Sequence, residues 1–135
     1  MSARLPFSVV TKPTGAACNL DCQYCFFLSK ELLYDAAAQT MSEQTLERYV
    51  EAFLESSPDG EVTMLWQGGE PTLRGLAFFE RLMDLCERYR RPTQSVRHAL
   101  QTNGTLVSDE WARFFADHGF LVGVSIDGPA PLHDA

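Results

Sequence analysis

Apolar residues recur along this chain in three segments with the i, i+3, i+4, i+7 spacing of a helix that buries one face. The segments run from Ser42 to about Ser56, from about Gly75 to Arg90, and from Ser108 to Gly119. Ser42 and Ser108 stand before the first helical residues, where a hydroxyl can accept a hydrogen bond from a free backbone N–H. The pattern therefore predicts three amphipathic helices.

Short apolar runs flank these helices. They span Leu5–Val10, Val62–Trp66, Ser95–Gln101 and Phe120–Ile126. Strands that alternate with helical connections favour right-handed βαβ units and a parallel sheet, so the predicted fold class is α/β. The segment Cys18–Ser29 is expected to begin as a loop and to turn into a short helix.

The residues best suited to chemistry follow the predicted strands. They are the cysteine loop that begins at Cys18, Gly68–Pro71, Gln101–Gly104 and Asp127–Pro129. In α/β folds ligands bind beyond the C-terminal ends of parallel strands, which lie together at one rim of the sheet. We therefore expect one site built from four loops.

Composition narrows the functional classes. The 135 residues suffice for one domain, and the net charge of −7 provides no basic surface for nucleic acid or an anionic membrane. No apolar stretch approaches the roughly 20 residues that span a bilayer, and the first residues do not resemble a signal peptide. A cytoplasmic protein is the expectation, with no nucleic-acid or membrane partner. A reducing compartment argues against structural disulfides.

Three cysteines, Cys18, Cys22 and Cys25, have the spacing C-x3-C-x2-C. Thiolates favour iron–sulfur clusters, zinc or copper(I), and a structural zinc site normally takes four ligands. Three thiolates on a cubane cluster leave one iron open to an external ligand. A zinc knuckle, a redox thiol pair and chance are the alternatives. Cys86 is expected to be a buried apolar residue, and His98 a structural one.

The cysteine loop resembles the radical SAM superfamily, whose signature is C-x3-C-x-aromatic-C, with Tyr24 as the aromatic residue. The resemblance implies a [4Fe-4S] cluster held by Cys18, Cys22 and Cys25. The amino and carboxylate groups of S-adenosyl-L-methionine (SAM) would chelate the fourth iron. Reduction would then split SAM into methionine and a 5′-deoxyadenosyl radical.

A second motif agrees with this resemblance. Gly68-Gly69-Glu70-Pro71 is similar to the family's loop that binds the methionine amino group of SAM. Glycines allow backbone carbonyls to approach a ligand closely, and a carboxylate complements an ammonium. By the same resemblance Ser125 contacts SAM, and the backbone of Tyr24 meets the adenine.

A narrower resemblance covers nearly the whole chain and points to the anaerobic sulfatase-maturating enzymes, which are SPASM-type maturases. It rests on Cys18–Phe27, Trp66–Leu73, Leu100–Leu106 and Val122–Pro129. These enzymes oxidise a cysteine or serine of a sulfatase to Cα-formylglycine with electrons from a donor such as flavodoxin or ferredoxin. Gln67 would line the substrate pocket, or it is an ordinary polar residue at a strand end. Phe27 departs from the tyrosine that such enzymes often carry.

This family continues beyond the present chain. The resemblance implies that residues 1–135 are an incomplete radical SAM core domain, about four β/α units of a partial (β/α)6 barrel. The C-terminal half of the barrel and a cysteine-rich domain with auxiliary clusters would be absent, as would the catalytic aspartate, and the fragment alone is expected to be inactive. A radical SAM maturase of another ribosomal peptide, a zinc-binding module and an inactive truncated product remain as alternatives.

Overall fold

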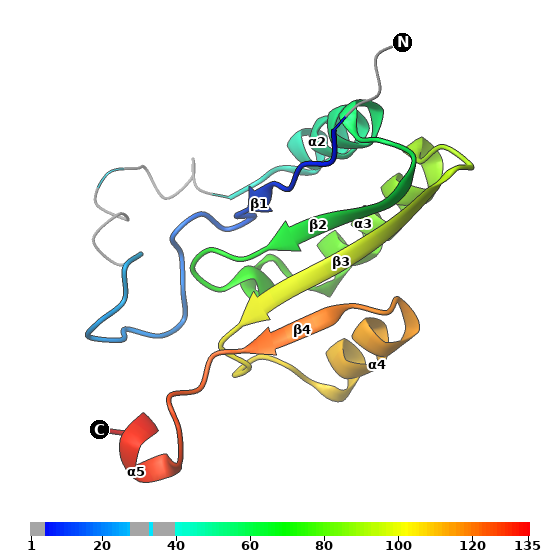
Figure 1. Cartoon of the computed structure of the whole chain (residues 1–135). Helices are drawn as coiled ribbons and strands as arrows, with labels where there is room; N and C mark the ends of the chain where they lie inside the picture. The colour runs from blue at the N-terminus through cyan, green and yellow to red at the C-terminus, as the bar shows by residue number, and fades with distance from the viewer. Residues whose placement is uncertain (1–4, 28–32, 34–39) are drawn as a thin grey trace.

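A parallel sheet of four strands organises the chain, in the order β1-β2-β3-β4 (Figure 1). The computed structural model describes residues 5–27, 33 and 40–135. The strands are β1 (Val10–Thr11), β2 (Gly60–Trp66), β3 (Gln94–Thr102) and β4 (Leu121–Val124). Because every pairing is parallel, the C-terminal ends of the strands meet at one rim, and the predicted α/β fold class is confirmed.

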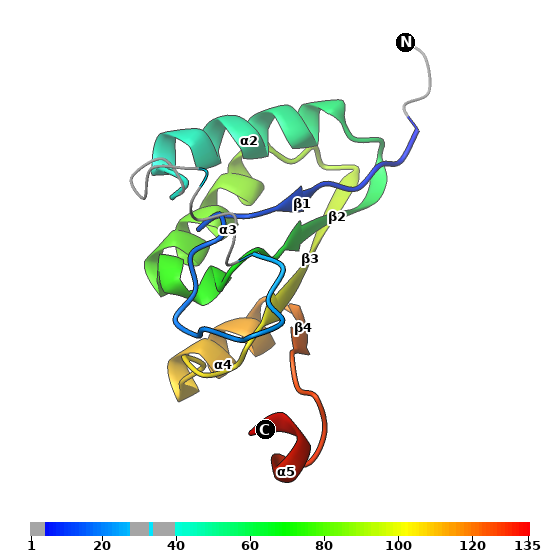
Figure 2. The same ribbon diagram turned by 90° about the vertical axis from the view of Figure 1, so that its left-hand side faces the viewer.

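Three helices cover one face of the sheet (Figure 2). They are α2 (Glu43–Ser56), α3 (Leu76–Tyr89) and α4 (Asp109–Asp117). The predicted caps are confirmed, because the Ser42 hydroxyl accepts a hydrogen bond from the Thr45 N–H and the Ser108 hydroxyl accepts one from the Trp111 N–H. Within the described part of the chain, no helix is long and apolar enough to cross a membrane.

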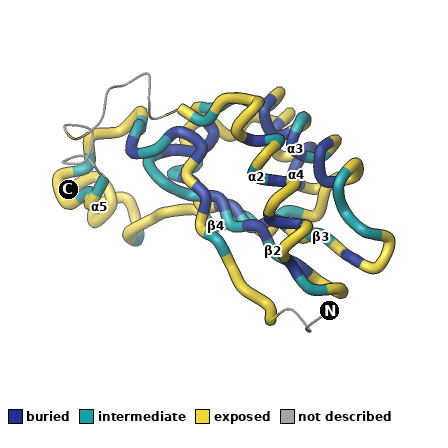
Figure 3. The backbone as a smooth tube through the Cα atoms, turned by 90° about the horizontal axis from the view of Figure 1, so that it is seen from above, coloured by how far each residue is buried: buried dark blue, intermediate teal, exposed yellow. Residues whose placement is uncertain are grey.

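Burial alternates along the central strands. Met64 and Trp66 on β2, and His98 and Leu100 on β3, are buried against the helices. Their neighbours in sequence face the opposite side and are half-buried or exposed (Figure 3). Such alternation follows from the two-residue period of a strand and marks a sheet with one covered face.

An aromatic core fills the space between sheet and helices. The Trp66 ring makes edge contacts with Phe79 at 5.8 Å and with Tyr49 at 5.9 Å between ring centroids. Phe79 in turn contacts Trp111 of α4 at 5.5 Å. Edge-to-face pairs of this kind stabilise a core beyond the area they bury. The result is a rigid support beneath the rim where the strands end.

The first strand is much shorter than predicted. Leu5–Val9 lies outside the sheet, and only Val10 and Thr11 pair with β2. The apolar pattern is explained by packing instead, because the Phe7 ring contacts Phe53 at 5.4 Å and Val9 packs against the core. Pro6 has no N–H to give to a ladder, which disfavours strand pairing here.

Other boundaries differ by a few residues. Strands β2 and β3 begin earlier than predicted, and β4 is shorter than predicted at both ends. At the start of β4 the Phe120 N–H donates to the Phe115 carbonyl of α4 and not to a neighbouring strand. Two short helices were not predicted, η2 (Pro71–Arg74) and α5 (Ala130–His133). The expected short helix after the cysteine loop is not seen in residues 18–27, which form turns, and its last residues, 28 and 29, lie outside the described residues.

His98 is a buried structural residue, as the sequence suggested. Its Nδ1 accepts a hydrogen bond from the Trp66 indole N–H at 3.3 Å, and its ring stacks on Phe120 at 4.8 Å between centroids. Nε2 lies 3.9 Å from the Cys86 sulfur. Burial, with a smaller repulsion from His118, lowers the pKa of His98 to about 4. The imidazole therefore stays neutral in the folded chain.

This burial predicts a loss of stability in mild acid. In the unfolded chain His98 has an ordinary pKa near 6.5, so between pH 6.5 and pH 4 the unfolded state binds a proton that the folded state does not. The free energy of unfolding should fall by about 3 kcal/mol across that window, and this contribution is fully present above pH 6.5. Urea unfolding at pH 7 and pH 4.5 measures the change.

The exposed His118 provides the control for this experiment. A His118→Gln variant should keep most of the pH dependence, whereas His98→Gln should lose the part due to His98. If the wild type and His98→Gln lose the same free energy between pH 7 and pH 4.5, His98 does not cause the fall.

Candidate cofactor site

A cleft of about 380 Å³ lies at the rim where the strands end. It brings together the cysteine loop, the loop after β2, the end of β3 and the residue after β4. Its lining consists of Cys18, Leu20, Cys22, Tyr24, Cys25, Phe26, Phe27, Gln67, Gly68, Gly69, Gln101, Thr102, Asn103 and Ser125. The predicted convergence of loops is therefore observed, although Asp127–Pro129 does not line the cleft.

The cysteine loop presents three free, half-buried thiols to this cleft. The Cys25 N–H donates a hydrogen bond to the Cys22 carbonyl at 3.0 Å, and this turn brings the two cysteines close together. Among the described residues, no three His, Cys, Asp or Glu side chains converge so as to hold a single metal ion. Thiolates of a [4Fe-4S] cluster bind different irons and so surround a group larger than one ion.

The glycine pair after β2 lies directly against the segment that leads into Cys18. Gly69 N–H donates to the Gly15 carbonyl at 2.9 Å, and Glu70 N–H donates to the Ala17 carbonyl at 2.8 Å. A Cβ added to Gly69 would lie 1.9 Å from the Ala17 carbonyl oxygen. Only glycine fits this approach, so the two sequence motifs form one unit of backbone.

The Glu70 side chain does not face the cleft. It is fully buried, and four protein donors surround its carboxylate. Oε1 accepts hydrogen bonds from the Thr72 N–H and hydroxyl at 3.1 and 2.6 Å and from the Thr102 hydroxyl at 2.6 Å. Oε2 accepts from the Asn103 N–H at 2.7 Å. The expected pairing of this carboxylate with an ammonium has no support in this geometry, because the donors are already provided by the chain.

Asn103 links the end of β3 to the cysteine loop. Its side-chain nitrogen lies 2.9 Å from the Asn19 side-chain oxygen and 3.7 Å from the Cys18 sulfur. Its side-chain oxygen accepts hydrogen bonds from the Thr105 N–H and hydroxyl at 3.0 and 2.8 Å. No motif singled out Asn103 as a contact of a cysteine. Its place after the third strand, at the predicted rim and within the Leu100–Leu106 segment, was the available signal.

Gln101 and Ser125 form a second pair on the rim. The Gln101 amide donates to the Ser125 hydroxyl at 2.9 Å, and the Ser125 N–H donates to the Thr102 carbonyl at 2.9 Å. A Cβ added to Gly123 would lie 2.2 Å from the Gln101 side-chain oxygen, so this glycine makes room for the amide. The sequence indicated Ser125 but did not indicate that Gln101 orients it.

Tyr24 connects the cysteine loop to the segment after β4. Its hydroxyl donates to the Asp127 carboxylate at 2.7 Å, and this hydrogen bond raises the pKa of Tyr24. His133 of α5 also approaches the Asp127 carboxylate, at 3.6 Å. The ring itself is exposed and lines the cleft. Phe27, further along the loop, lies under the Lys12 ammonium, which is 4.7 Å from the ring centroid.

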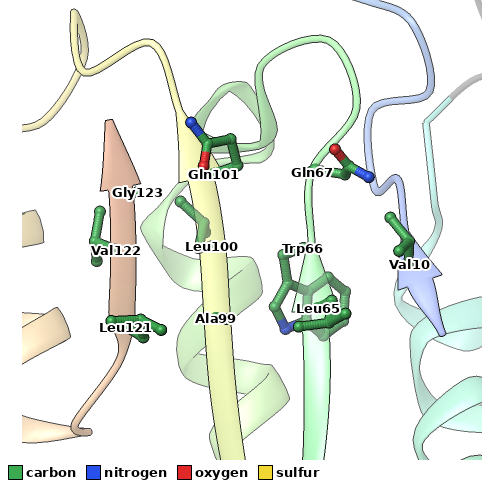
Figure 4. A pocket seen from close by; sticks show the side chains of 10 residues that line it. All are labelled: Val10, Leu65, Trp66, Gln67, Ala99, Leu100, Gln101, Leu121, Val122 and Gly123. Carbon is green, nitrogen blue, oxygen red and sulfur yellow. The ribbon is translucent and has the colours of Figure 1, made fainter. Parts of the chain in front are cut away.

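An apolar surface continues from the cleft over the uncovered face of the sheet (Figure 4). Gln67 and Gln101 stand at the ends of β2 and β3 and line both the cleft and this surface. Further down the strands the lining on this face is apolar, with Leu65, Ala99 and Leu121. A ligand reaching along this face from the cleft would meet two amides first and aliphatic groups after them.

The donor set suits a cubane cluster. Three thiols from one loop reach the cleft, while the fourth cysteine, Cys86, is buried in the core. Burial raises the pKa of the Cys86 thiol to about 12, which keeps it protonated and unsuited to metal binding. Glycine backbone and the Ser125 hydroxyl border the same cleft, as a small polar ligand beside the cluster would require.

This fold and site define a class of protein. The family model of the radical SAM superfamily matches residues 13–135, and the chain belongs to that superfamily. The match includes the cysteine loop and all the loops that line the cleft.

Several relatives are anaerobic sulfatase-maturating enzymes. A serine-type anaerobic sulfatase-maturating enzyme of Bacteroides thetaiotaomicron is 42% identical over 130 residues, which cover 96% of this chain and 31% of the relative. A cysteine-type anaerobic sulfatase-maturating enzyme of Clostridium perfringens is 41% identical over 130 residues, with 96% and 35% covered. The resemblance found in the sequence is thereby confirmed.

A solved structure agrees with these sequences. Native anSMEcpe with bound AdoMet and Cp18Cys peptide superposes with a TM-score of 0.85 at 41% identity, covering 96% of this chain and 34% of that one. The chain thus spans about a third of the length of these relatives.

Proposed function

We propose that this chain holds a [4Fe-4S] cluster through Cys18, Cys22 and Cys25, with SAM beside it. The observation that carries the proposal is that the Gly69 and Glu70 N–H groups bind the segment leading into Cys18, so that the three thiols and the Gly68–Gly69 pair line one cleft. Three ligands from the protein leave one iron for the amino and carboxylate groups of SAM. When bound, the reduced cluster supplies the electron that splits SAM into methionine and a 5′-deoxyadenosyl radical.

The chain's own residues would bind and orient SAM. Gly68 and Gly69 line the cleft, and their lack of side chains would let a ligand approach their carbonyl groups closely. Ser125, oriented by Gln101, offers a hydroxyl on the opposite side, and the Tyr24 backbone would meet the adenine. Glu70 would support these contacts from below, because its carboxylate fixes the end of β3.

We further propose that the activity is oxidation of a cysteine or serine of a sulfatase to Cα-formylglycine. The support is the similarity to maturases of both the serine type and the cysteine type. A substrate peptide would lie over the apolar sheet face beside Gln67, and a donor such as flavodoxin or ferredoxin would reduce the cluster. Residues 1–135 would form a portion of the radical SAM core domain.

Anaerobic reconstitution with ferrous iron and sulfide tests the cofactor assignment. We expect about four irons and four sulfides per chain, with an absorption band at roughly 400 nm from thiolate-to-iron charge transfer. Equilibrium dialysis should then show SAM binding only after reconstitution. A colourless chain that carries stoichiometric zinc would overturn the assignment.

The oxidation is tested on the full-length gene product, with SAM, a strong reductant and sulfatase-derived peptides that carry cysteine or serine at the target position. The expected products are 5′-deoxyadenosine and a peptide aldehyde, detected by mass spectrometry. If the cluster and SAM bind but neither peptide gains an aldehyde, the cofactor assignment stands and the sulfatase assignment is wrong.

A further inference from the structure

The Asn103 amide is held in one orientation beside the Cys18 sulfur. Its oxygen is engaged by two donors, the N–H and the hydroxyl of Thr105, at 3.0 and 2.8 Å. An amide has its donors on the nitrogen alone, so the NH2 group must point the other way, toward Asn19 and Cys18. The 3.7 Å separation between Nδ2 and Sγ is that of an N–H···S contact.

The backbone beneath this amide is fixed as well. The Asn103 N–H donates to the buried Glu70 carboxylate at 2.7 Å. The preceding residue, Thr102, is buried, donates to the same carboxylate at 2.6 Å and accepts from the Gly104 N–H at 3.0 Å. The Glu70 carboxylate that anchors this turn is buried, so water does not compete for its hydrogen bonds. The amide is thus preorganised and needs no rearrangement to meet the sulfur.

We infer that Asn103 raises the reduction potential of the cluster through its N–H···S contact with Cys18, in addition to the Leu20 N–H that lies 3.4 Å from the same sulfur, and that Glu70 positions Asn103. The inference rests on the proposed function, in which Cys18 is a cluster ligand. Reduction adds one electron to the cluster and increases the negative charge on its sulfur ligands. A donor aimed at a ligand sulfur stabilises the reduced form more than the oxidised form and so raises the potential.

The alternative is that Asn103 serves only to hold the cysteine loop, through its bond to Asn19. Variants at two positions separate these roles. Asn103→Asp keeps the oxygen that Thr105 binds but replaces the donor to Cys18 with a charged oxygen, whereas Asn103→Ala removes the donor without adding a charge. Asn19→Ala removes the amide–amide bond but leaves the Asn103 donor in place. Leu106→Ala, which changes an exposed side chain in the same turn, is the matched control.

Each reconstituted chain is titrated anaerobically with dithionite as the one-electron donor. Reduction is followed by the loss of absorption at roughly 400 nm and by the electron paramagnetic resonance signal of the reduced cluster. For Asn103→Asp and Asn103→Ala we expect full iron and sulfide content. We also expect a reduction equilibrium less favourable by about tenfold, a midpoint lower by about 59 mV. Asn19→Ala and Leu106→Ala should keep the wild-type midpoint.

Two results would overturn the inference, and they differ from failure of the proposed function. An Asn103→Asp chain with full cluster content and an unchanged midpoint would show that the contact does not tune the cluster. Equal shifts in Asn19→Ala and Asn103→Asp would show that the amide acts only through the loop. A wild-type chain that takes up no iron and sulfide would instead contradict the proposed function itself.

Discussion

Replacing Cys22 by alanine should abolish cluster binding and leave the fold intact. Cys22 is the middle ligand of the proposed set, and two thiolates in this loop cannot hold the cubane in place. The loss of iron and sulfide should be complete, because no fourth cysteine can substitute: Cys86 is buried on α3, away from the cleft. The iron and sulfide content is measured after anaerobic reconstitution, together with the absorption band at roughly 400 nm.

Helical structure should not change in this variant. The side chains of the cysteine loop lie outside the cluster of buried residues that forms the core, and Cys22 itself is only half-buried. Circular dichroism in the far ultraviolet should therefore match the wild type. Cys86→Ala is the matched control: it makes the same chemical change in the core, where a small cavity costs stability, and it should retain the whole cluster. Wild-type iron and sulfide in Cys22→Ala would show that the ligand assignment is wrong.

The fold was largely predictable because its signals are local. The apolar spacing of α2 and α4 gives one buried stripe on each helix, and Ser42 and Ser108 mark their starts in the sequence and in the structure. The error at the first strand arose because burial and strand pairing are separate requirements. Phe7 and Val9 are apolar because they pack on α2 and the core, yet Leu5–Val9 forms no ladder with β2.

The site was predictable as a location but not in its internal hydrogen bonds. The order of the loops along the chain was enough to bring the cysteines, Gly68 and Gly69, and Ser125 to one cleft. The orientation of the Glu70 side chain could not be predicted in this way. It depends on Thr102 and Asn103, which lie 32 and 33 residues further along the chain and meet Glu70 only because β2 and β3 are neighbours. A carboxylate in a cofactor loop suggests a ligand contact until the three-dimensional partners are known.

Glu70→Ala should destabilise the chain by about 3 kcal/mol even without cluster or SAM. The change removes the carboxylate that accepts four hydrogen bonds. The N–H groups of Thr72 and Asn103 then lose their acceptor beneath the protein surface. Removing one partner from such a buried set costs several kcal/mol, because the remaining polar groups stay desolvated. Urea unfolding of the unreconstituted chain measures the loss, and the exposed Glu55→Ala on α2 should change it little.

The same variants distinguish the structural role of Glu70 from the role that its motif suggests. Glu70→Gln keeps the size of the side chain and one acceptor oxygen, but it turns an NH2 group toward donors, so it should also destabilise the chain, though less than alanine. If the four internal hydrogen bonds contributed no stability and Glu70 served only to pair with the SAM ammonium, both variants would unfold like the wild type and only SAM affinity would fall. Because the Glu70 carboxylate accepts four internal hydrogen bonds, the variants should lose stability even before SAM is added. Any loss of SAM binding then follows from displacement of Thr102 and Asn103 at the end of β3, which the Glu70 carboxylate holds.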